Sequence, residues 1–193
     1  MDLNRRIRRH LEGHAETLSR LSEMEEGILD SARAIAEVLS AGGRVYLAGN
    51  GGSAADAQHI AAEMEGRFRI ERPARAVHCL TCNSSTFSSI ANDYGFDQVF
   101  SRQVEGFLEK GDLLILISTS GQSPNLVSAA KSAKEKGVSL LALLGRDGGE
   151  LLALCERNLL VPSAETAWIQ EAHITLGHML CDLVDEILER EGL

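Results

Sequence analysis

Two short polar segments have the residue types that bind a phosphate group. Residues 49–53 read Gly-Asn-Gly-Gly-Ser, and residues 118–124 read Ser-Thr-Ser-Gly-Gln-Ser-Pro. Glycine lets the backbone approach a ligand closely, and hydroxyls can hydrogen-bond phosphate oxygens without a lysine. We expect Ser53 to cap a following helix whose N–H groups favour an anion, and Pro124 to begin another. For either segment alone, the alternative is a plain turn.

Four further side chains could bind a metal ion or move protons. His59 and Glu63 are four residues apart on an expected helix, so they share one face and can meet one ion or substrate. Gln170 and His178 lie in an expected C-terminal helix, together with His173, which we expect either to pack in the core or to support a ligand residue. The alternative for each His is a structural or surface position.

The segments that must position these residues alternate between helices and short strands. Residues 2–40 have apolar positions at helical spacing, which predicts two helices or one helix broken near Ser22. Residues 165–189 are expected to form a long helix. Short apolar runs predict five strands, at residues 44–48, 76–80, 113–117, 138–144 and 158–161.

This order of elements predicts an α/β fold, a three-layer α/β/α sandwich around a five-stranded parallel sheet. Ligands of such sheets bind beyond the carboxyl ends of the strands. Both polar segments follow expected strands, so they should meet at one edge of the sheet. The 193 residues, 44% of them hydrophobic, suit one domain. We divide it into an N-terminal helical oligomerisation segment, residues 1–41, and an α/β core with the C-terminal helix, residues 42–193.

Charge and hydropathy argue against two classes of partner. The net charge of −9 does not suit a nucleic-acid surface. No apolar run reaches the roughly 18 residues of a membrane span, so we expect a cytoplasmic protein with no membrane partner. The cysteines are expected to be free thiols in the core, because Cys79 and Cys82 lack the second pair of a structural zinc site. The one basic cluster is interpreted as the solvated face of the first helix: Arg5, Arg6, Arg8 and Arg9.

Four motifs in a fixed order resemble the phosphoheptose isomerases of the sugar isomerase (SIS) domain superfamily. They are residues 49–59, Gly-Asn-Gly-Gly-Ser-Ala-Ala-Asp-Ala-Gln-His; residues 91–94, Ala-Asn-Asp-Tyr; the serine segment at residues 118–123; and residues 169–173, Ile-Gln-Glu-Ala-His. The likeness extends from about residue 40 to residue 188.

The resemblance implies conversion of sedoheptulose 7-phosphate to D-glycero-D-manno-heptose 7-phosphate, the first step toward ADP-heptose for lipopolysaccharide. It implies a homotetramer with active sites shared between subunits and one Zn²⁺ per subunit. Glu63 would be the base and His178 the acid. The implied metal ligands are His59, Glu63, Gln170 and His178. The implied substrate contacts are Asn50, Gly51, Gly52, Glu63, Asn92, Asp93, Ser118, Thr119, Ser120, Ser123 and Gln170.

One spacing constrains that ligand set. Gln170 and His178 are eight residues apart, which is roughly 12 Å along a regular helix. Either the C-terminal helix begins after Gln170, or the two ligands come from different chains.

Two alternatives remain beside the isomerase. One is a non-enzymatic SIS protein that binds the bacterial replication initiator, and the other is an isomerase of another phosphosugar. The presence of both Glu63 and His178 favours an enzyme. Ser84 and Ser85 stand where relatives have an Asp/Thr pair, and Trp168 stands where many have Arg. Since these positions lie near the expected pocket, they leave the preferred phosphosugar open.

Overall fold

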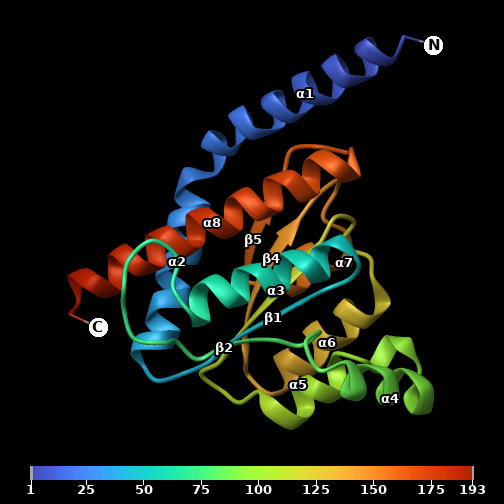
Figure 1. Ribbon diagram of the computed structural model, residues 1–193. Coiled ribbons are helices and arrows are strands. Elements are labelled where there is room, and N and C mark those ends of the chain that lie inside the picture. The colour runs from blue at the N-terminus through green and yellow to red at the C-terminus, as the bar shows by residue number, and fades with distance from the viewer. Residues whose placement is uncertain (1, 193) are drawn as a thin grey trace.

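Five parallel strands form a sheet between two layers of helices (Figure 1), in a computed structural model that describes residues 2–192. The strand order is β2-β1-β3-β4-β5, so the expected α/β/α sandwich is confirmed. Each expected strand differs from the observed one by at most one residue at either end. The strands are β1 (Val45–Gly49), β2 (Val77–Cys79), β3 (Leu113–Ser118), β4 (Ser139–Leu144) and β5 (Arg157–Leu160).

The central strand shows why the chain folds into layers. Every residue of β3 is buried, because helices cover both faces of the sheet. Successive side chains point to opposite faces: Leu113 and Ile115 join the core beneath α2, α3 and α8, and Leu114 and Leu116 join the core beneath α5, α6 and α7. The helices are α1 (Leu3–Ser19), η1 (Arg20–Met24), α2 (Glu25–Ser40), α3 (Gly52–Glu65), α4 (Ser84–Tyr94), η2 (Phe96–Gln98), α5 (Ser101–Phe107), α6 (Pro124–Glu135), α7 (Gly149–Leu154) and α8 (Thr166–Arg190).

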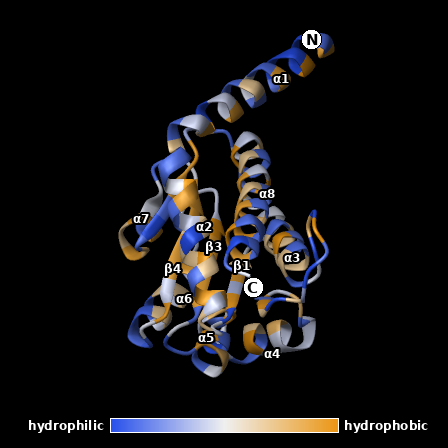
Figure 2. Ribbon diagram, turned by 90° about the vertical axis from the view of Figure 1, so that its left-hand side faces the viewer, coloured by the Kyte–Doolittle hydropathy of each residue, from blue (hydrophilic) through white to orange (hydrophobic). Residues whose placement is uncertain are grey.

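The N-terminal segment forms two helices separated by the 3₁₀ turn η1, which contains Ser22 as expected. Helix α1 extends beyond the body of the molecule (Figures 1 and 2) and lies against the start of α8. Its basic cluster is exposed, as predicted. Three apolar side chains at one-turn spacing are also exposed, namely Leu3, Ile7 and Leu11. The described chain therefore leaves an apolar stripe of α1 uncovered.

The cysteines depart in part from expectation. All four are free thiols, and Cys155 and Cys181 are buried, but Cys79 is only half-buried and Cys82 is exposed. Cys82 lies outside the core because it stands in the turn between β2 and α4. Among residues 2–192, no helix combines the length and apolar character that a membrane span needs.

Candidate active site

Two loops meet at the carboxyl edge of the sheet, as the order of elements predicted. Strands β1 and β3 are neighbours, with Gly49 opposite Ile117, so the segments that follow them emerge side by side. Asn50 and Asn125 join these loops through two reciprocal amide hydrogen bonds of 2.9 Å. The Asn50 side chain, an expected substrate contact, thus also fixes one loop to the other. Asn125 was not singled out from sequence, because Asn after Pro124 reads as an ordinary helix residue.

The first loop differs from expectation at its helix cap. Gly51, with φ +55°, is the N-cap of α3, and no side chain caps this helix. Ser53 is instead buried in the first turn, so the predicted Ser53 cap is wrong. A Cβ at position 49 would lie 2.4 Å from the Ser53 carbonyl oxygen, which shows how tightly the chain doubles back here. The uncapped helix end retains the partial positive charge that attracts an anion.

The second loop is shaped by its own hydroxyls. Ser118 Oγ accepts a hydrogen bond from the Gly121 N–H at 3.0 Å, and Ser120 Oγ accepts one from the Gln122 N–H at 3.3 Å. Pro124 begins α6 as expected, and the N-cap residue Ser123 makes no capping bond through its side chain. The loop therefore forms a small cradle beside the N-terminus of α6, where a phosphate is favoured.

Cationic side chains lie beside this cradle and were missed from sequence. An open hollow of about 880 Å³ is lined by Ser120 and Gln122 and also by Arg20 and Arg146. Arg146 has a left-handed backbone, with φ 56°, and its guanidinium donates to Thr166 Oγ1 at 3.0 Å. Its position directly after a strand, β4, was the available signal. An anion bound in this hollow would therefore have positive charge nearby as well as neutral donors.

A second group of side chains lies where α3 passes along α8. His59 Nε2 is 3.3 Å from Glu63 Oε1, and the rings of His59 and His178 meet edge to face with centroids 5.1 Å apart. The Phe68 ring stacks on the His178 ring, with centroids 5.4 Å apart. The structure therefore brings together three of the four expected metal ligands. Within residues 2–192, however, no three His, Cys, Asp or Glu side chains are arranged to hold one metal ion.

Gln170 lies apart from this group. A Cβ at position 52 would be 2.5 Å from Gln170 Nε2, which places the Gln170 amide over the first loop. Helix α8 is continuous from Thr166 to Arg190, so the alternative that it begins after Gln170 is wrong. Within this helix Gly177 allows a close approach of α3, because a Cβ there would fall 2.4 Å from Ile60 Cδ1. The other expectation, that the two ligands come from different chains, stays a prediction.

The other expected contacts lie around the edge of these loops. Asn92 and Asp93 are exposed on α4, and Asn92 donates to Asp93 Oδ1 at 2.7 Å. Ser84 and Ser85 form the first turn of α4, just beyond the carboxyl end of β2. Trp168 points toward α1, where a Cβ on Gly13 would overlap its ring.

The carboxyl group of Asp56, beside His59, was not identified from the sequence. Burial raises the pKa of Asp56 to about 6, against the opposing effect of His59, and its Oδ2 is buried without a hydrogen-bond partner. The spacing of three residues between Asp56 and His59 could have indicated this neighbour.

Comparison with known proteins gives a consistent result. The SIS domain family model matches residues 9–145. The chain is 46% identical over 182 residues to a phosphoheptose isomerase of Rhodospirillum rubrum, covering 94% of this chain and 97% of that one. It is 48% identical over 176 residues to that of Aliarcobacter butzleri, covering 91% and 93%. The solved phosphoheptose isomerase of Neisseria gonorrhoeae superposes with a TM-score of 0.90 at 40% identity, over 95% of this chain and 99% of the other.

Proposed function

Because this chain belongs to the SIS domain family and, within it, to the phosphoheptose isomerases, we propose that it converts sedoheptulose 7-phosphate to D-glycero-D-manno-heptose 7-phosphate. The observation that carries the proposal is the meeting of His59, Glu63 and His178 between α3 and α8. In the same proposal the product enters ADP-heptose synthesis for lipopolysaccharide or a related surface glycan, and the enzyme works in the cytoplasm.

The reaction moves a carbonyl from C2 to C1 without net loss of atoms. Glu63 removes a proton from C1, and the electron pair of that bond forms the C1–C2 double bond of an enediolate, with negative charge on the C2 oxygen. His178 protonates that oxygen and accepts the proton of the C1 hydroxyl. Return of a proton to C2 then leaves the aldehyde at C1. Glu63 lies on α3 and His178 on the adjacent helix α8, so one can act on the carbon-bound proton and the other on the oxygens.

The donor set supports a zinc ion at this site. His59 and His178 offer imidazole nitrogens and Glu63 offers carboxylate oxygens, which are groups that Zn²⁺ binds. These side chains fit the ion by chemistry, although in the part of the chain that the structure describes no three His, Cys, Asp or Glu side chains are arranged to hold one metal ion. Zinc bound there would polarise the substrate oxygens. Since Gln170 is two turns away from His178, we propose that a second subunit supplies the Gln170 ligand.

The phosphate is proposed to bind in the cradle of residues 118–123, against α6. Backbone N–H groups and the hydroxyls of Thr119, Ser120 and Ser123 would hold it, with Arg146 alongside. This binding is distant from the reacting carbons, so it positions them. Asn92 and Asp93, together with Gly51 and Gly52, would line the sugar.

An isomerase assay with three ketose phosphates tests the function. Sedoheptulose 7-phosphate, fructose 6-phosphate and ribulose 5-phosphate are compared by kcat/KM at saturating zinc, with the aldose product measured directly. We expect the highest kcat/KM with sedoheptulose 7-phosphate. Preference for another ketose would assign the enzyme to another phosphosugar. No turnover with any of the three would contradict the isomerase proposal and favour the initiator-binding alternative.

A further inference from the structure

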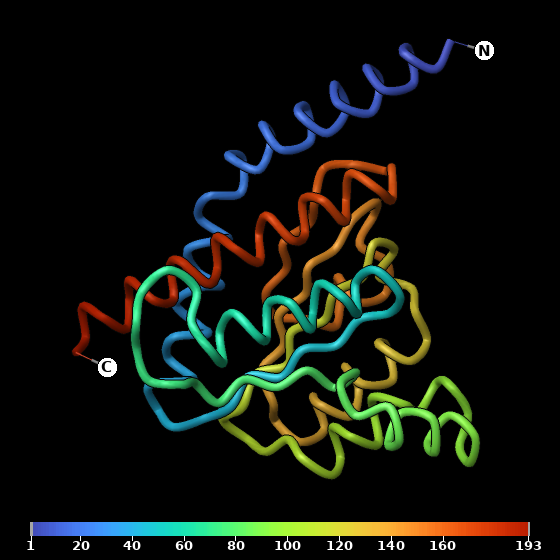
Figure 3. Tube along the Cα trace, viewed as in Figure 1, coloured from blue at the N-terminus to red at the C-terminus, as the bar shows by residue number. Residues whose placement is uncertain are grey.

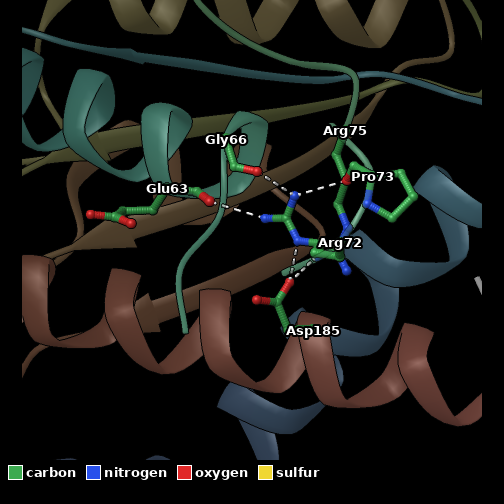
Figure 4. A network of polar contacts seen from close by, with 6 residues as sticks. All are labelled: Glu63, Gly66, Arg72, Pro73, Arg75 and Asp185. Carbon is green, nitrogen blue, oxygen red and sulfur yellow. Dashed lines mark hydrogen bonds and ion pairs between the residues drawn. The ribbon is translucent and has the colours of Figure 1, made fainter. Parts of the chain in front are cut away.

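A buried ion network lies at the end of the helix that carries Glu63. Arg72 belongs to the segment between α3 and β2, which crosses to the C-terminal half of α8 (Figure 3). Its side chain is only 6% exposed. The guanidinium donates from Nη2 to the Glu63 carbonyl at 3.0 Å and from Nη1 to the Gly66 carbonyl at 3.0 Å (Figure 4).

These bonds cap the C-terminus of α3. The last four carbonyls of a helix have no partner within it, and a cation is favoured at that end. Helix α3 has no basic residue in its own last turn. Arg72 supplies donors from six and nine residues further along the chain, measured from Gly66 and Glu63. The backbone carbonyl of Glu63 is therefore held directly by a buried cation.

Asp185 connects the same cation to α8. Its Oδ1 accepts from Arg72 Nε at 2.9 Å and also from Arg75, and its side chain is 6% exposed. Asp185 stands seven residues after His178, which is two helical turns, so both lie on the face of α8 that meets α3. Arg72 thus joins the backbone of Glu63 to the helix of His178.

The surroundings of Cys181, a buried thiol on α8, also place Glu63, Asp185 and Arg72 close together. Burial first, and then the negative charges of Asp185 and Glu63, raise the pKa of Cys181 to about 12, against the effect of Arg72. Glu63, Asp185 and Arg72 therefore all lie near one point between α3 and α8.

We propose that Arg72, held by Asp185, is a positioning residue that fixes the Glu63 carboxylate relative to His178. The inference rests on the proposed function. Figure 4 shows the Glu63 side chain pointing away from Arg72 while its backbone faces the guanidinium. Arg72 therefore acts through the helix and does not touch the reacting carbons. Proton transfer requires close alignment, and a misplacement of about 1 Å can lower a rate by roughly 10²-fold.

The test uses two conservative variants, Arg72→Lys and Asp185→Asn. Lysine keeps the charge but lacks the planar fork that donates at once to three carbonyls, those of Glu63, Gly66 and Pro73, and to a carboxylate. Asparagine keeps the shape of Asp185 and removes its charge. The matched controls are Arg69→Lys and Asp182→Asn, because Arg69 and Asp182 link the same segment to α8 at 3.2 Å, with side chains 68% and 47% exposed.

For each full-length variant we would measure kcat, KM, thermal midpoint and the kinetic isotope effect with substrate deuterated at C1. In the Arg72 and Asp185 variants we expect kcat to fall at least about tenfold while KM stays within about twofold, since the phosphate cradle is untouched. The isotope effect should rise, because proton abstraction becomes slower than the other steps. The control variants should match wild type.

The outcomes separate this inference from the proposed function. Loss of kcat with a raised isotope effect, in protein that is folded at the assay temperature, supports positioning. Variants whose kcat and isotope effect equal those of wild type, or whose activity falls only in proportion to the unfolded fraction, would overturn it. If wild type itself does not isomerise sedoheptulose 7-phosphate, the proposed function fails instead.

Discussion

At the scale of single residues, the surroundings decide what each histidine can do. His59 is half-exposed and lies 3.3 Å from a carboxylate, so it is open to a ligand. His173 is fully buried, and its Nε2 lies 3.0 Å from the Leu144 carbonyl oxygen. Burial lowers the pKa of His173 to about 4, so this side chain is neutral in the folded protein. The packing role expected for His173 agrees with this environment.

His173 should make stability depend on pH. Its folded pKa, about 4, lies below its ordinary value, so the unfolded chain binds the proton more strongly and acid favours unfolding. Above about pH 6.5 neither state binds the proton, so His173 does not lower the free energy of unfolding. Below that pH the free energy of unfolding falls as far as about pH 4, by about 2 kcal/mol between pH 7 and pH 5. Urea unfolding of wild type and His173→Gln at both pH values checks this. An equal pH dependence in the two proteins would contradict it.

At the scale of elements, the strands were predictable, whereas the residue that caps α3 was not. Runs such as residues 113–117 are apolar at every position, and that pattern has few alternatives to a covered strand. Ser53 looked like a cap because serine often caps helices, but the N-cap is Gly51, and Ser53 is buried two residues further along, in the first turn. Which loops meet follows from strand order, so Asn125 could not be paired with Asn50 from sequence alone.

The approach of His59 to Glu63 could be predicted from the sequence, because residues four apart lie on the same face of a helix. Their approach to His178 depends on how α3 packs on α8, where Gly177 lets the two helices come close. Arg146 and Arg72 were not identified, since their roles depend on neighbours distant in sequence. The zinc ion and the site assignments stay predictions.

Docking of α1 on α8 should depend on Gly13. A Cβ at this position would lie 2.1 Å from the Trp168 ring, so Gly13→Val must push the helices apart, at a cost of about 1–3 kcal/mol. Trp168 is the only tryptophan, so its emission reports the contact. We expect a shift to longer wavelength. The control is Gly106→Val, where a Cβ meets no atom within 4 Å. Unchanged emission in Gly13→Val would contradict this packing.

At the scale of the whole molecule, one chain leaves two features incomplete. The stripe of Leu3, Ile7 and Leu11 on α1 is exposed, and Gln170 lies eight residues before His178 on the continuous helix α8, so the two cannot easily reach one ion. A second copy of the chain would satisfy both. We therefore expect a homotetramer with shared active sites, in which the N-terminal helices and α8 form the contacts.

Hybrid assemblies test the sharing of sites. Gln170→Ala and His178→Ala each remove one proposed ligand of the shared site, so an assembly made of either variant alone should be nearly inactive. If the two residues of one site come from different subunits, random mixing should restore about a quarter of the sites. The variants are unfolded together, refolded and assayed against each refolded alone. Absence of restored activity in a mixed tetramer would contradict shared sites, and a monomer with full activity would contradict the tetramer.

The most direct test of the whole account is turnover by Glu63→Gln with bound metal measured in the same sample. Glutamine keeps the shape and one acceptor oxygen but cannot take the C1 proton, so kcat should fall by at least about 10²-fold. Sugar-phosphate binding should persist, and Glu65→Gln, an exposed neighbour on α3, should behave as wild type. Excess zinc should not restore the rate, whereas a residue that acts only as a ligand would be rescued. Near-normal turnover in fully metallated Glu63→Gln would contradict Glu63 as the base.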